Sequence, residues 1–116
     1  SALADSSFGP LVTRDADGAT SVRWFSSSAW RIGETTYDDL EEERYRVLDA
    51  EPARASFEGR AVRAIIRGAD TLRLETRIEV SGTADALRVR VRRTLSRGGS
   101  VVRQRIWDER IPRRWN

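Results

Sequence analysis

The sequence contains neither cysteine nor histidine among its 116 residues. The lack of cysteine excludes disulfide bonds and thiolate chemistry. The lack of histidine removes the usual general base at neutral pH and the commonest neutral metal ligand. All 21 basic residues are arginine, and the absence of lysine excludes Schiff-base chemistry and the lysine of a Walker loop. We therefore expect no catalytic residue, no metal site and no cofactor in this chain.

Methionine is absent as well, so we expect the chain to be processed or to be a fragment of a longer protein. No run approaches the roughly 20 apolar residues of a membrane-spanning helix, and no signal segment is recognisable. These features predict a soluble protein without membrane partners, and the missing signal segment favours the cytoplasm. An arginine-only basic set is typical of a GC-rich genome and favours a bacterial source.

The net charge is +3, but 18 acidic residues are interleaved with the arginines. A surface that follows a phosphate backbone normally has clustered positive charge, so the pattern disfavours a nucleic-acid partner. We interpret the densest basic group as a solvated strand face whose arginines pair with glutamates on neighbouring strands. This group comprises Arg88, Arg90, Arg92, Arg93, Arg103 and Arg105.

Apolar and charged residues alternate with a period of two in residues 71–81 and 87–97, which is typical of half-buried β-strands. Gly98-Gly99 predicts a two-residue hairpin turn into residues 100–107, because both central positions of a type I′ turn need positive φ. No long helix is expected. The sequence therefore predicts an all-β fold of six to eight antiparallel strands, either a jelly-roll-like β-sandwich or a flattened barrel. Shorter alternating stretches occupy residues 11–14, 19–25, 29–34, 43–48 and 60–67.

One domain is expected, because the chain is long enough for one hydrophobic core but not for two. Residues 1–8 are mostly small and polar, and we predict that they are disordered or were introduced by cloning. We predict that the ordered part of the chain begins at Gly9-Pro10. Residues 9–116 are then a single β-domain.

The glycine turn also predicts a register and, from it, a candidate ligand site. If Arg97 faces Ser100, then Arg93 faces Gln104 on the otherwise apolar side of the sheet. A buried guanidinium needs a partner, which the carboxylate of a ligand would supply. The simpler interpretation, which we favour, is that Arg93 lies near the strand end and extends to solvent. Candidate ligand-binding residues are Arg93, Gln104, Trp24, Trp30 and Trp107.

Several short motifs suggest a relationship. They are Trp-Asp-Glu-Arg-Ile-Pro-Arg at 107–113, Gly-Pro-Leu at 9–11 with Arg-Asp-Ala-Asp-Gly at 14–18, and Gly-Glu-Thr-Thr-Tyr at 33–37. Together they resemble the C-terminal β-domain of the cocaine esterase / X-Pro dipeptidyl-peptidase group of α/β-hydrolases. The resemblance covers most of the chain. It departs at Arg114, where the family tends to carry Asp, and at Glu51-Pro52, which match the family's Asp-Pro-x-x-Ala step only in part.

The resemblance implies an accessory role. In that family a Ser, an Asp and a His of a separate α/β domain carry out hydrolysis, and the terminal β-domain packs against it and shapes the substrate cleft and the dimer surface. This chain has no Gly-x-Ser-x-Gly elbow and no histidine to complete a triad, so no catalytic residue carries over. The expected partners are an α/β-hydrolase domain or a second copy of the chain.

We favour two hypotheses for the function. One is a non-catalytic accessory domain, whose signature is a large apolar face that is exposed without its partner, with Trp24, Phe25, Trp30 and Trp107 as candidates for that face. The other is a stand-alone binder of an apolar or carboxylate small molecule in a cavity anchored by Arg93. An enzyme that uses Tyr37 or Tyr45 beside acidic residues is a third interpretation, and nucleic-acid binding is a fourth.

Overall fold

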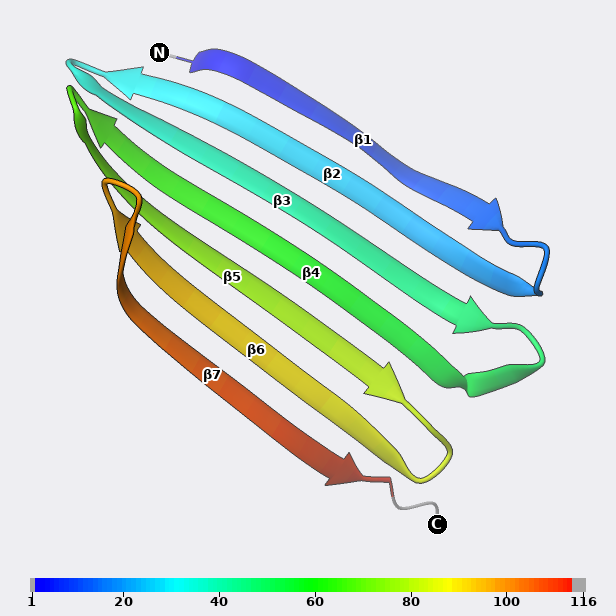
Figure 1. The fold of residues 1–116 in the computed structure, drawn as a ribbon. Coiled ribbons are helices and arrows are strands. Elements are labelled where there is room, and N and C mark those ends of the chain that lie inside the picture. Colours follow the sequence, from blue (N-terminus) through cyan, green and yellow to red (C-terminus); the bar gives the residue numbers. More distant parts are fainter. Residues whose placement is uncertain (1, 114–116) are drawn as a thin grey trace.

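The computed structural model describes residues 2–113 of the chain. Each strand pairs antiparallel with the next, so the order in the sheet is the order in the sequence (Figure 1). No helix occurs in the part of the chain that is described, and the prediction of an all-β antiparallel fold of six to eight strands is confirmed. The seven strands are β1 (Ala2–Arg14), β2 (Ala19–Ile32), β3 (Thr35–Leu48), β4 (Glu51–Arg67), β5 (Asp70–Gly82), β6 (Ala86–Arg97) and β7 (Ser100–Pro112).

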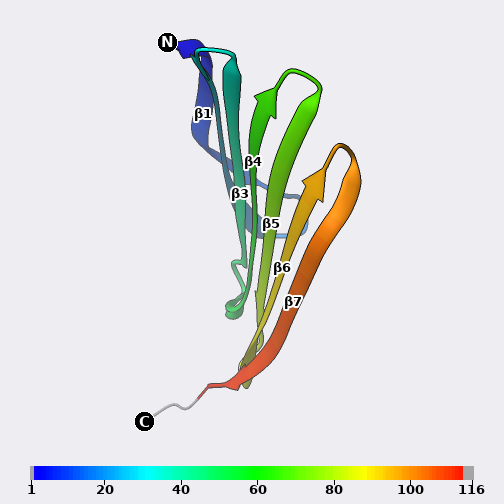
Figure 2. The ribbon, with the colours of Figure 1, turned by 90° about the vertical axis from the view of Figure 1, so that its left-hand side faces the viewer.

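The strands form one open, twisted layer, which Figure 2 shows from its edge. Among the described residues, β1 contacts only β2 and β7 contacts only β6, so the sheet does not close on itself. The radius of gyration is 17.9 Å, whereas a compact domain of this length has about 13.4 Å. A sandwich or a flattened barrel needs a second layer against this one.

Gly98 and Gly99 form the turn between β6 and β7 as predicted, with φ angles of 57° and 83°. Both angles lie in the left-handed region, which glycine adopts without steric cost. Arg97 lies opposite Ser100, as a two-residue hairpin loop requires.

The N-terminal residues are part of the sheet. Residues 1–8 were predicted to be disordered or introduced by cloning, whereas β1 begins at Ala2 and pairs with the serine-rich part of β2, for example Ser6 with Ser27. Residue 1 lies outside the described residues. The predicted boundary at Gly9-Pro10 is instead a β-bulge inside β1. A Cβ atom on Gly9 would lie 2.6 Å from the carbonyl oxygen of Arg23, so β1 approaches β2 too closely there for a side chain.

The two faces of the sheet differ in composition, because side chains alternate along each strand and paired residues point to the same side. We call them the apolar face and the charged face. The charged face carries Arg23, Glu42, Arg44, Glu58, Arg60, Arg73, Glu75, Arg77, Glu79, Arg88, Arg90, Arg92 and Asp108. The apolar face carries Val22, Trp24, Trp30, Tyr37, Tyr45, Phe57, Ile65, Leu72, Leu74, Ile78, Val80, Val89, Val91, Leu95 and Trp107.

No core lies within this single layer. Of the described residues, only Ala19, Ser21 and Ala86 are buried. The accessible surface is 8565 Å², about 2,100 Å² more than a compact monomer of this mass exposes. The alternation in the sequence thus produces an amphipathic sheet whose apolar side lacks a covering layer.

Candidate functional site

The side chains of the apolar face form rows that cross the strands, because the register between paired strands is unbroken over most of the sheet. The central row runs from Trp24 on β2 through Gly59 and Ile78 to Trp107 on β7. Its two tryptophans are 37% and 40% exposed. Large side chains are therefore half uncovered at both ends of this row, with the small Gly59 between them.

The next row on the apolar face is polar and separates charges of opposite sign. It contains Glu41 on β3, Ala61 on β4, Thr76 on β5, Arg93 on β6 and Arg105 on β7. The acid lies toward one side of the sheet and the two guanidinium groups toward the other.

The neighbouring rows repeat this separation of charge. Asp39 and Glu43 extend the acidic side along β3, and Arg103 extends the basic side along β7. Within the described part of the chain, Asp39 is the one member of this charged set with an ion-pair partner, at 3.7 Å from Arg63 on β4. Around the Glu41 row, the acids of the apolar face therefore lie on β3 and the arginines on β6 and β7, while Arg63 on β4 and Glu109 on β7 depart from this separation.

The predicted pairing of Arg93 with Gln104 is wrong by one residue. The structure pairs Arg93 with Arg105 and Thr94 with Gln104, because Val102 is an extra residue in a bulge between the Arg103 and Val101 pairs. Two adjacent apolar residues, at 101 and 102, break the alternation of β7 and are the sequence signal of this bulge.

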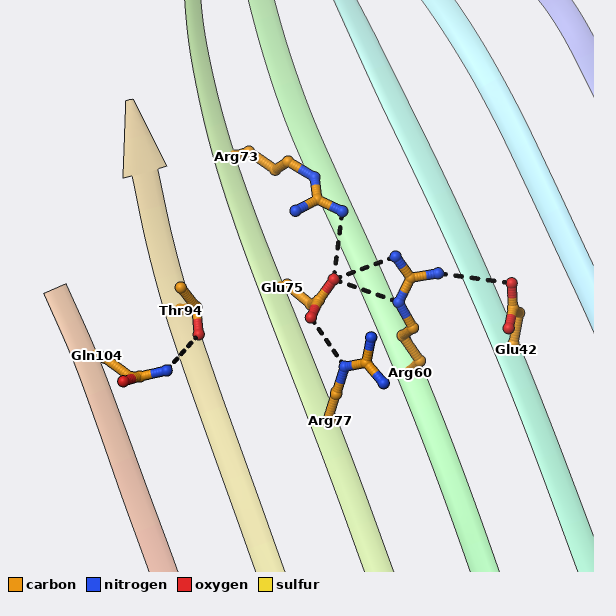
Figure 3. Close-up of polar contacts among 7 residues, drawn as sticks. All are labelled: Glu42, Arg60, Arg73, Glu75, Arg77, Thr94 and Gln104. Atoms are coloured by element: carbon orange, nitrogen blue, oxygen red, sulfur yellow. Dashed lines mark hydrogen bonds and ion pairs between the residues drawn. The ribbon is translucent and has the colours of Figure 1, made fainter. Parts of the chain in front are cut away.

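Arg93 and Gln104 consequently lie on opposite faces and do not form one site. The Gln104 amide donates a hydrogen bond to the Thr94 hydroxyl at 3.2 Å on the charged face (Figure 3). Arg93 remains on the apolar face, beside Arg105. Neither residue lines the larger cavity described below.

The three tryptophans predicted as ligand-binding residues do share the apolar face. Trp30 is 50% exposed and lies on β2 together with Trp24, while Trp107 lies on the edge strand β7. Arg105 lies over the Trp107 ring at 4.9 Å. Phe25 was also expected on this face, but its ring stacks on Phe8 on the charged face at 5.5 Å.

The charged face is centred on Glu75, whose side chain is only 15% exposed. Its carboxylate accepts hydrogen bonds from Arg77 at 2.9 Å, Arg60 at 3.1 Å and Arg73 at 3.2 Å (Figure 3). Arg60 also lies 3.6 Å from Glu42. The hydrogen bond from Arg77 lowers the pKa of Glu75, partial burial opposes this, and Arg60 lowers it further.

Two exposed ion pairs link β6 to its neighbouring strands. Arg88 pairs with Asp108 at 3.0 Å, and Arg97 pairs with Asp70 at the same distance. Each arginine lowers the pKa of its acidic partner, chiefly through the hydrogen bonds. Exposed pairs of this kind contribute little to stability and do not create reactive groups.

An open cavity of about 550 Å³ lies over the charged face. Its lining combines acids and arginines in similar numbers with the stacked pair of Phe8 and Phe25, so it has no strong preference for ligands of one charge. Within residues 2–113, no three acidic side chains converge to hold a metal ion. The cavity is lined by Phe8, Arg23, Trp24, Phe25, Glu42, Glu43, Arg44, Glu58, Gly59, Arg60, Arg77, Ile78 and Glu79.

Tyr37 and Tyr45, considered as acid–base groups, lie on the apolar face with Glu41 and Glu43, whereas Glu42 points to the other face. None of the described segments is a helix suited to crossing a membrane. The candidate functional site is therefore the apolar face itself. The chain matches no model of a known protein family, and no solved structure matches it.

Proposed function

We propose that this chain is a non-catalytic interaction domain that packs the apolar face of its sheet on a partner. The uncovered apolar face carries this proposal, because about 2,100 Å² of surface beyond that of a compact monomer is exposed and no second layer covers this face. Three half-exposed tryptophans add to it, since aromatic side chains are enriched where proteins meet.

The resemblance in the sequence motifs suggests what kind of domain this is. We propose kinship with the terminal β-domain of the cocaine esterase / X-Pro dipeptidyl-peptidase group, in which such a domain packs on a partner or shapes a substrate cleft. The missing histidine and the lack of a nucleophile with a base support a role without chemistry. Hydrolysis would then belong to a separate catalytic domain.

The test uses the purified chain and a dye that fluoresces on exposed apolar surface, together with an assay on activated esters. We expect dye binding whenever the face is uncovered and no ester hydrolysis by the chain alone. An α/β catalytic domain of the cocaine esterase type should suppress the dye signal when it binds. Ester hydrolysis by the chain itself, or a chain that neither binds dye nor associates with anything, contradicts the proposal.

Small-molecule binding is the second candidate, and the position of Arg93 favours it. Arg93 lies on the apolar face beside Arg105 and has no ion-pair partner among the described residues. A ligand carboxylate held under a covered face would satisfy both guanidinium groups.

We expect native mass spectrometry to detect a co-purifying carboxylate if this second candidate holds, and Arg93→Ala to lose it at least tenfold, because one charge-assisted hydrogen bond is worth about 1.5–3 kcal/mol. Gln104→Ala is the matched control, since Gln104 lies on the charged face. Retention of the same ligand by Arg93→Ala argues against the cavity.

A further inference from the structure

We infer that the partner of the apolar face is a second copy of this chain, packed face to face about a two-fold axis to form a two-layer β-sandwich. The inference rests on the proposed function, because it assumes that the apolar face is the packing surface, and it names the occupant. Three features of the sheet carry it: the area that needs cover, the protected edges and the charge pattern of the face.

The area fits a permanent dimer. Each chain exposes about 2,100 Å² more than a compact monomer of its mass. If both copies bury that excess, the interface totals roughly 4,000 Å², which lies within the range of obligate homodimers. A second sheet of the same dimensions is also the right size to cover a face of this length.

The edges of the sheet are protected, so association through the edge strands is disfavoured. β1 is interrupted by the bulge at Gly9 and Pro10, and proline has no N–H to donate to a neighbouring strand. β7 turns Arg103, Arg105 and Glu109 toward the apolar side, and inward-pointing charges of this kind block the addition of another strand. The face is the surface that remains.

The charge pattern of the Glu41 row is complementary to itself, whereas Glu43 and Asp39 would lie over Val91 and Leu95 of the second copy. A two-fold axis that is parallel to the strands and lies between β4 and β5 puts β3 of one copy over β6 of the other, and keeps each cross-strand row over its own equivalent. Glu41 then lies over Arg93 of the second copy, and Arg93 lies over the second Glu41. Because the axis relates the copies, this ion pair forms twice.

The facing residues of the Glu41 row also match in size under this operation. Ala61 on β4 lies over Thr76 of the second copy, so a small residue meets a larger one. Aligned sheets cross at about −30°, so this match holds best near the centre, where these two residues lie. A two-fold axis across the strands would instead place β3 over β3 and bring acids together, which is unfavourable.

The experiment measures subunit number by sedimentation equilibrium for the wild-type chain and three variants. We expect the wild type to be a dimer with a Kd below about 1 µM, as for interfaces of this size. Glu41→Arg and Arg93→Glu should each weaken dimerisation at least tenfold, because each places like charges against each other. The double variant Glu41→Arg/Arg93→Glu should restore the affinity to within a few-fold of wild type, since the pair is reversed.

Glu58→Arg is the matched control. It makes the same change of charge on the charged face, where it loses an attraction to Arg44 and gains one to Glu79, so dimerisation should not change. Circular dichroism confirms that each variant keeps its strands, and the double variant keeps the test decisive if a single variant unfolds.

A monomeric wild type overturns the inference, as does a dimer in which the double variant is as weak as the singles. If the monomer binds dye and is covered by a catalytic domain, the proposed function stands and only the second copy is wrong. If the monomer binds no dye and no partner, both fail.

Discussion

Replacing Ile78 with aspartate is expected to leave the chain monomeric where the wild type is dimeric. Ile78 lies in the central row of the apolar face, between Gly59 and Val91 on the neighbouring strands. When the face is covered, the new carboxylate has no cation beside it in that row. An unpaired buried charge costs at least about 3 kcal/mol, which corresponds to more than a hundredfold weaker association. Sedimentation velocity and dye binding measure the change.

Ser81→Asp provides the control for this substitution. Ser81 lies three residues further along β5 on the charged face, exposed and opposite Arg88, so the same carboxylate is placed in solvent near a cation. We expect this variant to associate like the wild type. If Ile78→Asp associates as strongly as Ser81→Asp, the apolar face is not the packing surface.

Glu75→Gln is expected to lower the free energy of unfolding by about 2 kcal/mol, which is large for a residue on a strand face. The carboxylate is the shared acceptor of Arg60, Arg73 and Arg77, and it is mostly buried beneath them. Glutamine keeps the size but not the charge, so three guanidinium groups remain close together, and of the three, among the described residues, Arg60 alone keeps an ion pair, with Glu42. Urea unfolding followed by tryptophan fluorescence measures the loss.

The same residue makes stability depend on acid. Because folding lowers the pKa of Glu75, the unfolded chain binds more protons than the folded chain between the two pKa values. The stabilisation is therefore complete above the ordinary glutamate value of 4.5 and is lost as the pH falls through the lower pKa of the folded state. Glu75→Gln should show a shallower loss of stability on acidification than the wild type.

Glu79→Gln is the matched control for Glu75→Gln. Glu79 lies on the same strand and face but is exposed, and no arginine donates a hydrogen bond to it among the described residues. We expect a change below about 0.5 kcal/mol, as at an ordinary surface position. Equal effects of the two substitutions would show that the arginines around Glu75 do not act as a network.

Much of the sheet could be predicted from the sequence, because strand formation and side-chain alternation depend on neighbouring residues. The alternation from residue 71 to 97 predicted β5 and β6, and Gly98-Gly99 predicted the turn into β7. These features needed no knowledge of contacts between distant segments.

The register of β7 and the start of β1 could not be predicted in the same way. The bulge at Val102 shifts one strand by one residue, which separates Arg93 from Gln104 and moves them to opposite faces. The pairing of Ser6 with Ser27 depends on a serine-rich segment about twenty residues away in the sequence. Small polar side chains show no apolar–polar alternation from which the strand could be predicted. Both errors arise where local patterning is weakest.

The order of the strands has a consequence for how the protein reaches its final state. Every strand pairs with its predecessor in the chain, so each hairpin can close as soon as its second half has been synthesised, with short loops and low contact order. Covering the apolar face is different, because it requires a separate surface to arrive by diffusion. We expect assembly to be a fast local zippering followed by a slower step whose rate depends on protein concentration.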